Sequence, residues 1–296
     1  MSGRELIQQL VNALSLGSIY ALLALGLSVV YGVMGLLNFA FGELVTITGY
    51  TMYFVSGGNE SFLLMALVGI AASTVSSMGM ELIAFRPLRR ASFLTLLFTS
   101  FALAQIIQNL FRQLVSPRPK GVPVPDLFNE AVTIGSIKIG VLPLITTGVG
   151  IGSLLLLTLF FRRSSAGLAM RAASQDFVTA RLMGIPANRI VSFAFAISGL
   201  LAGIAGVLWV ARLTSVSPAM GFTPLLQAFI ASVIGGLGSL TGAVAGGFFL
   251  GFLEILLQAT LPSGLLPFAQ ALTLLAIVGV LYVRPQGLLG RKAEAL

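Results

Sequence analysis

The sequence predicts an all-α protein that crosses a membrane several times. Of its 296 residues, 57% are hydrophobic and 9% are charged, and the mean hydropathy is +1.01. Soluble domains carry roughly a quarter charged residues. The apolar stretches also exceed the ~20 residues that a helix needs to cross a bilayer. The bilayer is therefore the solvent, and we expect residues 1–296 to form one transmembrane domain.

The apolar segments give a count of the crossings. They fall at 10–33, 36–55, 62–84, 93–115, 139–161, 190–211 and 225–283. The last is long enough for two or three crossings, with breaks expected at the glycines of 235–238 and at the Pro-Ser-Gly of 261–264. The total is about eight or nine spans. No small-residue cleavage site follows the first residues, so we expect an uncleaved first span.

The basic residues orient these spans. Three clusters stand in gaps between apolar segments: Arg86, Arg89 and Arg90; Arg162, Arg163, Arg171, Arg181 and Arg189; Arg284, Arg291 and Lys292. The positive-inside rule places them, and the C-terminus, in the cytoplasm. The net charge of +8 is then a feature of topology, with no nucleic-acid partner.

Two outer segments and the start of the chain complete the expected topology. Segments 56–61 and 112–138 are expected outside, with an extended course for the proline-rich 116–125. Alternation leaves two possibilities for the start. Either two crossings place the N-terminus outside, or the segment near 38–42 is broken. Broken helices occur in membranes only where they line a cavity or are buried in protein.

Several chemistries have no residues to carry them. The sequence contains no cysteine and no histidine, which excludes disulfides, thiolate nucleophiles and histidine-based metal sites or proton shuttles. It also lacks a Gly-x-x-x-x-Gly-Lys-Ser/Thr motif, so no P-loop ATP site is expected. We therefore predict a transport protein rather than an enzyme, without cofactor, metal or catalytic residues.

Three carboxylates lie within or beside apolar segments. A charge in mid-bilayer is costly, so such residues usually face a bundle interior or a pathway. Glu43 is the best functional candidate, because it follows Asn38 and Gly42 in the segment suspected to be unwound. Glu81 is expected at the membrane interface beside a basic cluster, and Glu254 is expected to form an interhelical hydrogen bond. Small residues at four-residue spacing in 199–206 and 242–251 predict close helix packing.

The longest polar interior stretch is 162–189. Its residues predict two short helices, one over 166–173 and one that follows Asp176 and ends at Gly184. Two interpretations remain open from the residues alone. The pair is either a docking element or a solvated loop that anchors the topology.

Four motifs resemble the permease subunits of LIV-type ABC importers for branched-chain amino acids. They are Gly-Leu-Leu-Asn-Phe-Ala-Phe-Gly-Glu at 35–43, Phe-Arg-Pro-Leu-Arg-Arg-Ala at 85–91, Gly-Leu-Ala-Met-Arg-Ala-Ala at 167–173 with Ala-Arg-Leu-Met-Gly-Ile at 180–185, and Gly-Gly-Leu-Gly-Ser-Leu-Thr-Gly-Ala at 235–243 with Arg-Pro-Gln-Gly-Leu-Leu-Gly at 284–290. Their order matches the family. The resemblance implies an ABC importer permease fold.

The resemblance also implies partners and site residues. In the family, segment 162–189 is the cytoplasmic coupling loop that docks on an ATP-binding subunit, and the matching positions are Gly167, Arg171, Ala172 and Gly184. The expected partners are a second permease, two ATP-binding subunits and an extracytoplasmic solute-binding protein at a bacterial inner membrane, surrounded by lipid. The path residues would be Asn38, Phe41, Gly42 and Glu43.

The sequence leaves alternatives open for the transported solute and for the class of transporter. Phe41 stands where the family often has histidine, so urea, short amides or aromatic acids remain as cargoes beside branched-chain or other hydrophobic amino acids. A stand-alone secondary transporter or channel is the rival class. Inverted repeats would favour it, but no repeat is evident between the two halves of the sequence. An integral membrane enzyme would need a catalytic constellation that the chain lacks.

Overall fold

Seven helices of the chain are long and apolar enough to cross a membrane. The computed structural model describes residues 3–58, 60–89, 91–134, 137–175, 177–184 and 186–284. The long helices are α1 (Gly3–Met34), α3 (Phe62–Met80, continued by a π-helical turn over Glu81–Phe85), α4 (Phe93–Leu114), α5 (Val141–Arg163), α8 (Ala187–Leu213), α10 (Leu240–Thr260) and α11 (Ala269–Val283, preceded by a 3-10 turn over Ser263–Phe268). The predicted helical membrane fold is confirmed.

Two shorter helices lie among the long ones. These are α2 (Phe41–Ser56) and α9 (Phe222–Gly235). At 1.5 Å per residue they reach only about 24 and 21 Å, less than a hydrocarbon core of about 30 Å. Both predicted breaks in the last apolar block are confirmed, because α9 ends at Gly235 and α10 ends at Thr260. The count of eight or nine crossings stays a prediction, since neither short helix spans alone.

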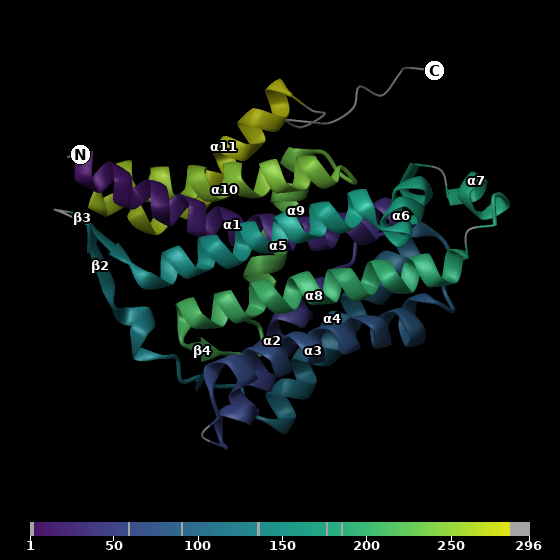
Figure 1. Ribbon diagram of the computed structural model, residues 1–296, viewed down its shortest axis with the longest axis horizontal. Coiled ribbons are helices and arrows are strands. Elements are labelled where there is room, and N and C mark those ends of the chain that lie inside the picture. Colours follow the sequence, from purple (N-terminus) through teal and green to yellow (C-terminus); the bar gives the residue numbers. More distant parts are fainter. Residues whose placement is uncertain are drawn as a thin grey trace.

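The molecule has two distinct ends (Figure 1). At one end lie the start of α1 and the antiparallel hairpin of β2 (Ala131–Ile134) and β3 (Ile137–Gly140); we call it the hairpin end. The short helices α6 (Ser165–Gln175) and α7 (Phe177–Leu182) project from the opposite end. The strands β1 (Lys120–Gly121) and β4 (Ser215–Val216) also pair antiparallel. These two small sheets are the one addition to the expected all-α fold.

The two halves of the chain repeat one helix order in opposite directions. Each half runs long helix, short helix, long helix, outer helix, as α1 to α4 and as α8 to α11. Helix α1 starts at the hairpin end, whereas α8 starts beside α7 (Figure 1). The packing repeats as well, because α1 contacts α9 and α10 just as α8 contacts α2 and α3. The repeat is not evident in the sequence, because helix lengths and pairings repeat without evident repetition of residues.

Close helix packing is carried by the small residues. Helix α1 runs through the centre, with 94% of its apolar window buried. Gly247 and Gly251 of α10 lie directly against its backbone, and Gly199 and Gly203 of α8 lie against α3. A side chain at any of these four positions would overlap the neighbouring helix. The sequence prediction of close packing at these spacings is confirmed.

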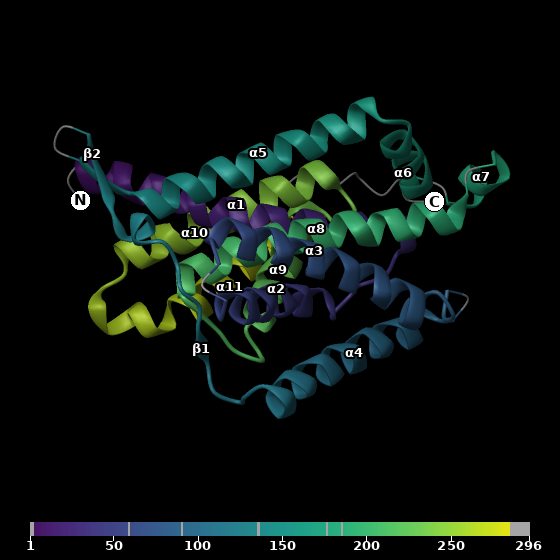
Figure 2. The same ribbon diagram turned by 60° about the horizontal axis from the view of Figure 1, so that its bottom comes forward.

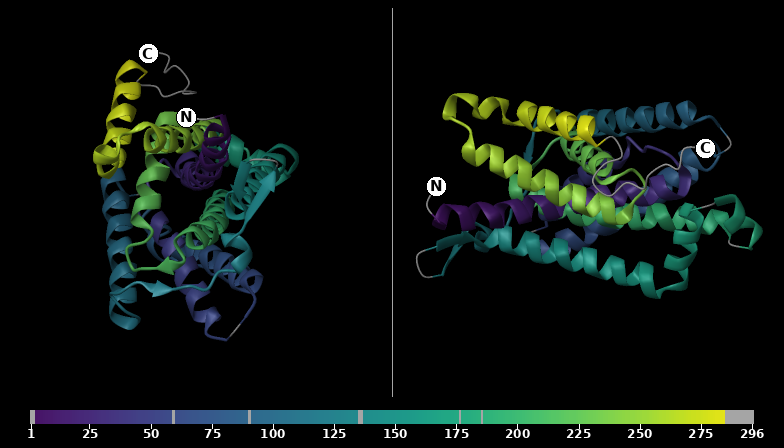
Figure 3. Two further views of the ribbon diagram at one scale, coloured as in Figure 1. Left: turned by 90° about the vertical axis from the view of Figure 1, so that its left-hand side faces the viewer. Right: turned by 90° about the horizontal axis from the view of Figure 1, so that it is seen from above.

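The fourth helix of each half lies at the outside of the bundle. Only 22% of the apolar window of α4 and 17% of that of α11 are buried. Figure 2 shows α4 standing apart from the other helices, and both views in Figure 3 place α4 and α11 on the same side of the molecule. Helices α4 and α11 are thus the least buried of the seven candidate spans, and they share one side of the molecule.

Candidate functional site

The chain is unwound between α1 and α2. Gly35 has a φ of 64°, a left-handed conformation that favours glycine, and its N–H donates to the Tyr31 carbonyl at 2.7 Å. The chain then runs without helix to Ala40, and α2 begins at Phe41. Of the two possibilities left open for the start of the chain, the structure has the broken segment near 38–42.

The unwound backbone is satisfied by two polar side chains. Asn38 is buried, and its Oδ1 accepts a hydrogen bond from the Ala40 N–H at 3.0 Å. The Oγ of Ser100 on α4 accepts from the Phe39 N–H at 3.1 Å and donates to the Leu37 carbonyl at 3.4 Å. Buried backbone groups need such partners in a membrane. Asn38 and Ser100 therefore stabilise the break.

The first turns of α2 and α9 meet at two glycines. A Cβ on Gly42 would lie only 2.5 Å from the Gly221 carbonyl oxygen. A Cβ on Gly221 would overlap the Gly42 carbonyl oxygen. The Gly221 N–H donates to Thr46 Oγ1 at 3.0 Å. Because α2 and α9 occupy equivalent places in the two halves, this contact lies where the repeats meet.

Phe41 fills the interior beside this contact. It is 1% exposed, and its ring lies so close to Gly26 of α1 that a Cβ there would be 2.9 Å from the ring Cζ. That same Cβ would be 3.4 Å from the Ser198 carbonyl of α8. Phe41 therefore packs between α1 and α8 in this conformation and does not line an open channel.

Glu43 connects α2 to α4. Its carboxylate is 1% exposed and accepts a hydrogen bond from Gln108 Nε2 at 2.7 Å. Two turns further along α2, the ring of Tyr50 stacks on the ring of Phe111 of α4 at a centroid distance of 4.1 Å. The four predicted path residues thus lie together at the start of α2, and Ser100 and Gln108 on α4 are partners that sequence reasoning missed.

A large cavity lined by described residues lies elsewhere. It has a volume of about 680 Å³ and a polar lining that includes Gln9, Asn12, Arg212 and Gln258 near the hairpin end. None of the four predicted path residues lines it.

The segment predicted to couple to a partner forms the expected pair of short helices. Gly167 lets α6 fold back onto the end of α5, because a Cβ there would lie 2.6 Å from the Phe161 Cα, and its N–H donates to Ser164 Oγ at 2.9 Å. Gly184 follows α7 with a φ of 84° and is exposed. Asp176 lies outside the described residues.

Arg171 and Ala172 point less outward than the resemblance implies. Both are half-buried, and Arg171 lines a small cavity with Gly32 of α1 and Gly238. Large apolar side chains occupy the exposed surface instead: Leu168 is 62% exposed, Leu182 81% and Met183 80%. Their sequence signal was present, since Leu and Met stand in an otherwise polar segment, but their exposure depends on how α6 and α7 fold.

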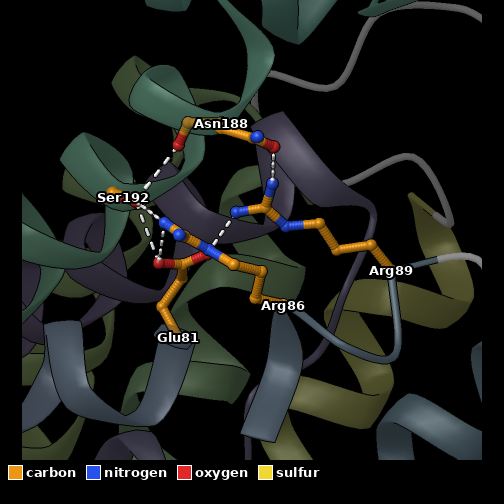
Figure 4. Close-up of polar contacts among 5 residues, drawn as sticks. All are labelled: Glu81, Arg86, Arg89, Asn188 and Ser192. Atoms are coloured by element: carbon orange, nitrogen blue, oxygen red, sulfur yellow. Dashed lines mark hydrogen bonds and ion pairs between the residues drawn. The ribbon is translucent and has the colours of Figure 1, made fainter. Parts of the chain in front are cut away.

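Glu81 forms the centre of a charged cluster beside the start of α8 (Figure 4). Its side chain is fully buried and pairs with Arg86, at 3.2 Å, and with Arg89. Ser192 Oγ donates to its second oxygen at 2.9 Å, and Arg89 donates to Asn188 Oδ1. Glu81 lies beside the basic cluster, as expected, and two arginines and α8 enclose it. The cluster joins the junction of α3 and α4 to the start of α8.

Glu254 forms the interhelical hydrogen bond that was predicted. The Tyr20 hydroxyl of α1 donates to one carboxylate oxygen at 2.8 Å, and Gln258 Nε2 donates to the other at 3.2 Å. No group of three or more acidic, histidine or cysteine side chains that would hold a metal occurs in the part of the chain that the structure describes. Arg90, Arg291 and Lys292 lie outside that part.

Comparison with known proteins identifies the family. The family model described as "Branched-chain amino acid transport system / permease component" matches residues 9–283. The chain belongs to this family. It is 33% identical to the high-affinity branched-chain amino acid transport system permease protein LivH of Salmonella typhimurium and covers 96% of that protein. It is 34% identical to the corresponding protein BraD of Pseudomonas aeruginosa, again with 96% coverage of each chain.

A more distant relative is named for a different solute. The chain is 27% identical to the ribose import permease protein RbsC of Escherichia coli over 84% of its own length and 77% of that protein. The resemblance seen in the four motifs is confirmed, and the chain is a membrane permease component rather than an enzyme.

Proposed function

We propose that this chain is a permease subunit of an ABC importer for branched-chain or other hydrophobic amino acids. It pairs with a second permease of the same type, and two separate ATP-binding subunits supply the energy. An extracytoplasmic solute-binding protein delivers the solute. The family match over 9–283 carries the proposal, and relatives named as branched-chain amino acid permeases support the choice of solute.

The end that carries α6 and α7 faces the cytoplasm in this proposal. The described basic residues Arg86, Arg89, Arg162, Arg163 and Arg189 belong to elements at that end. Short loops on the cytoplasmic side are enriched in arginine and lysine. The C-terminus then also lies in the cytoplasm of a bacterium, and the hairpin end faces outward across the inner membrane.

The two short helices α6 and α7 couple the permease to an ATP-binding subunit. Leu168, Leu182 and Met183 give them an exposed apolar surface outside the bundle, which is typical of an interaction site. Gly167 and Gly184 set the shape of the pair at its two ends. Arg171 and Ala172 hold it against the bundle. Movement of the ATP-binding subunit is transmitted through α8 and the Glu81 cluster to the outer helix α4.

The solute passes next to the start of α2. Asn38, Phe41, Gly42 and Glu43 meet at an unwound segment, a feature that transporters use near the bilayer midplane for solute sites. The closed packing of Phe41 fits a resting conformation in which the path is shut. Glu43 supplies the acceptor and Phe41 the apolar surface that an amino acid with a hydrophobic side chain needs.

The rival class is a stand-alone secondary transporter or channel. The inverted arrangement of the two halves is common among secondary transporters, so this observation favours the rival. The family match outweighs it, because inverted halves suit any permease that alternates between two open sides. The alternative cargoes of the proposed importer are urea, short amides or aromatic acids, and the distant relative adds ribose to these alternatives.

Purification followed by uptake tests the proposal. The tagged chain is purified from its native membrane, and the complex is inserted into liposomes together with its binding protein. We expect ATP-binding subunits to copurify and labelled leucine to enter only with ATP. A panel of unlabelled valine, phenylalanine, urea, acetamide and ribose as competitors then identifies the cargo. Ion-driven uptake by the chain alone would contradict the proposal.

A further inference from the structure

Helix α4 carries exposed polar side chains next to the side that contacts α2. Gln105, Asn109 and Gln113 follow one another at intervals of four residues, which places them in one row on a helix. Arg112 lies beside this row. All four side chains are exposed, and we call them the α4 polar row. Figure 2 shows that α4 stands apart from the rest of the bundle.

The row reaches deep into the membrane. Helix α4 ends at Leu114, and Gln105 lies about 14 Å before that end at 1.5 Å per residue. This is close to half of a hydrocarbon core of about 30 Å. Arg112 and Gln113 are near enough to the end to reach the interface. Gln105 and Asn109 are not.

Two of the three amides of the row lack hydrogen-bond partners among the described residues. Asn109 Nδ2 donates to the Gln105 carbonyl at 2.8 Å. Among the described residues, the side chains of Gln105 and Gln113 form no hydrogen bond. An amide in hydrocarbon without a partner is unfavourable. Contact between this surface and lipid hydrocarbon is therefore energetically unfavourable.

The equivalent helix of the second half exposes mainly apolar side chains. On α11, which occupies the place of α4 in the second half, the exposed side chains include Leu274, Leu275 and Val278. Helix α4 itself has a second exposed row, Leu110 and Leu114, at 50% and 79% exposure. One helix thus presents a surface suited to lipid and, on another side, a surface suited to water.

The α4 polar row continues from the predicted path residues. Gln108 faces α2 and donates to the buried carboxylate of Glu43. Arg112 follows Gln108 by one turn on the same side of α4. Polar groups therefore extend without interruption from Glu43, through Gln108, to Arg112 and the amides.

We propose that the α4 polar row faces the water-filled translocation path and contacts the solute as it passes, whereas the Leu110–Leu114 row faces lipid. The inference rests on the proposed function, because it assumes a path beside α2 and α4. The chemistry suits a small solute with a carboxylate. The guanidinium of Arg112 pairs with that group, and the amides donate and accept hydrogen bonds in place of water.

The chain contains no cysteine, so single cysteines test this assignment without background labelling. The variants Q105C, N109C and Q113C are compared with L110C and L114C, which lie at matched depths. The complete transporter in membrane vesicles is treated with a charged, membrane-impermeant thiol reagent. We expect the three polar-row cysteines to react about tenfold faster or more, because the reactive thiolate forms in water, and we expect solute to slow them.

Two outcomes would overturn the assignment. Equal rates for the two rows would contradict a water-filled path at the polar row. Unreactive polar-row cysteines in every transport state would show that another protein or lipid covers them. Uptake by the parent transporter, measured in the same vesicles, separates this result from the proposed function. Normal uptake with equal labelling rates refutes the α4 assignment alone, whereas absent uptake by the parent refutes the function.

A second variant tests the contact with the solute. R112Q removes the charge from an exposed position and is expected to leave the folded amount in the membrane unchanged. We expect it to raise the KM for a carboxylate-bearing solute and to leave a neutral competitor such as acetamide unaffected. An unchanged KM for the carboxylate-bearing solute would contradict the role of Arg112.

Discussion

The backbone carbonyl of Gly42 occupies the space in which a side-chain carbon on Gly221 would lie. The two glycines belong to α2 and α9, the short helices of the two inverted halves. Neither α2 nor α9 is long enough to span a bilayer, and their first turns meet at this contact. The pair therefore fixes how closely the two halves approach beside the predicted path.

Replacing Gly221 by alanine tests this contact. Gly221 has φ −74° and ψ −13°, which alanine adopts without strain, so only overlap with Gly42 remains. We predict a loss of about 1–3 kcal/mol or more from overpacking, measured by thermal unfolding of the purified complex. Gly148 of α5 is the matched control, because a Cβ there meets nothing within 4 Å. Gly148→Ala should be neutral or slightly stabilising. Equal effects of the two variants would refute the close approach.

A double-mutant cycle tests the packing of Phe41 against α1. Gly26→Ala places a Cβ 2.9 Å from the Phe41 ring, so it should destabilise the protein. Phe41→Leu removes the ring atoms that this Cβ meets. We predict that the two changes are not additive, with a coupling of about 0.5–3 kcal/mol. Additive effects on thermal unfolding would indicate that the ring lies elsewhere.

The cluster around Glu81 predicts an order of effects among its members. Removing one partner from a buried ion pair typically costs about 3–5 kcal/mol, so we predict Glu81→Ala to be the most damaging change. Arg89→Ala should cost more than Arg86→Ala, because the side chain of Arg89 is 18% exposed and that of Arg86 is 42% exposed. Thermal unfolding of the three variants checks the order. A larger loss for Arg86→Ala would contradict it.

Acidic substitutions on α6 and just beyond α7 distinguish residues that dock a partner from residues that pack against the bundle. Met183 is 80% exposed, so Met183→Glu should leave the permease folded in the membrane and reduce the amount of ATP-binding subunit that copurifies. Arg171 instead lines a cavity against α1, so Arg171→Glu should lower the folded amount itself. Membrane level and copurified subunit are measured for both variants. Normal copurification with Met183→Glu would exclude that residue from the docking surface.

The sequence predicted those features that depend on local residues. Glycines at 235–238 and the proline at 262 marked real helix ends, and the polar stretch 162–189 contained the two short helices. The break near Asn38 was one of the two possibilities left for the start of the chain, because too few residues precede 56 for three full crossings. Each of these features follows from turn-forming residues or from the length of a segment. None of them requires knowledge of a contact with a distant part of the chain.

Other features depend on contacts between distant parts of the chain. The burial of Glu81 depends on Ser192, 111 positions away along the chain, and on Arg89, which donates to Asn188, 99 positions away from it. The inverted halves became evident only from helix pairings. The importance of Gln108 likewise arises from its contact with Glu43. In the sequence, Gln108 is one of several amides on α4, and nothing local distinguishes it.

Uptake of labelled leucine into proteoliposomes tests the proposed importer most directly. The vesicles contain this chain, its partner permease, the ATP-binding subunits and the binding protein. We predict uptake that requires ATP and that is lost when the chain carries Met183→Glu. Uptake without ATP, or ion-driven uptake by this chain alone, would contradict the assignment as a permease subunit powered through α6 and α7.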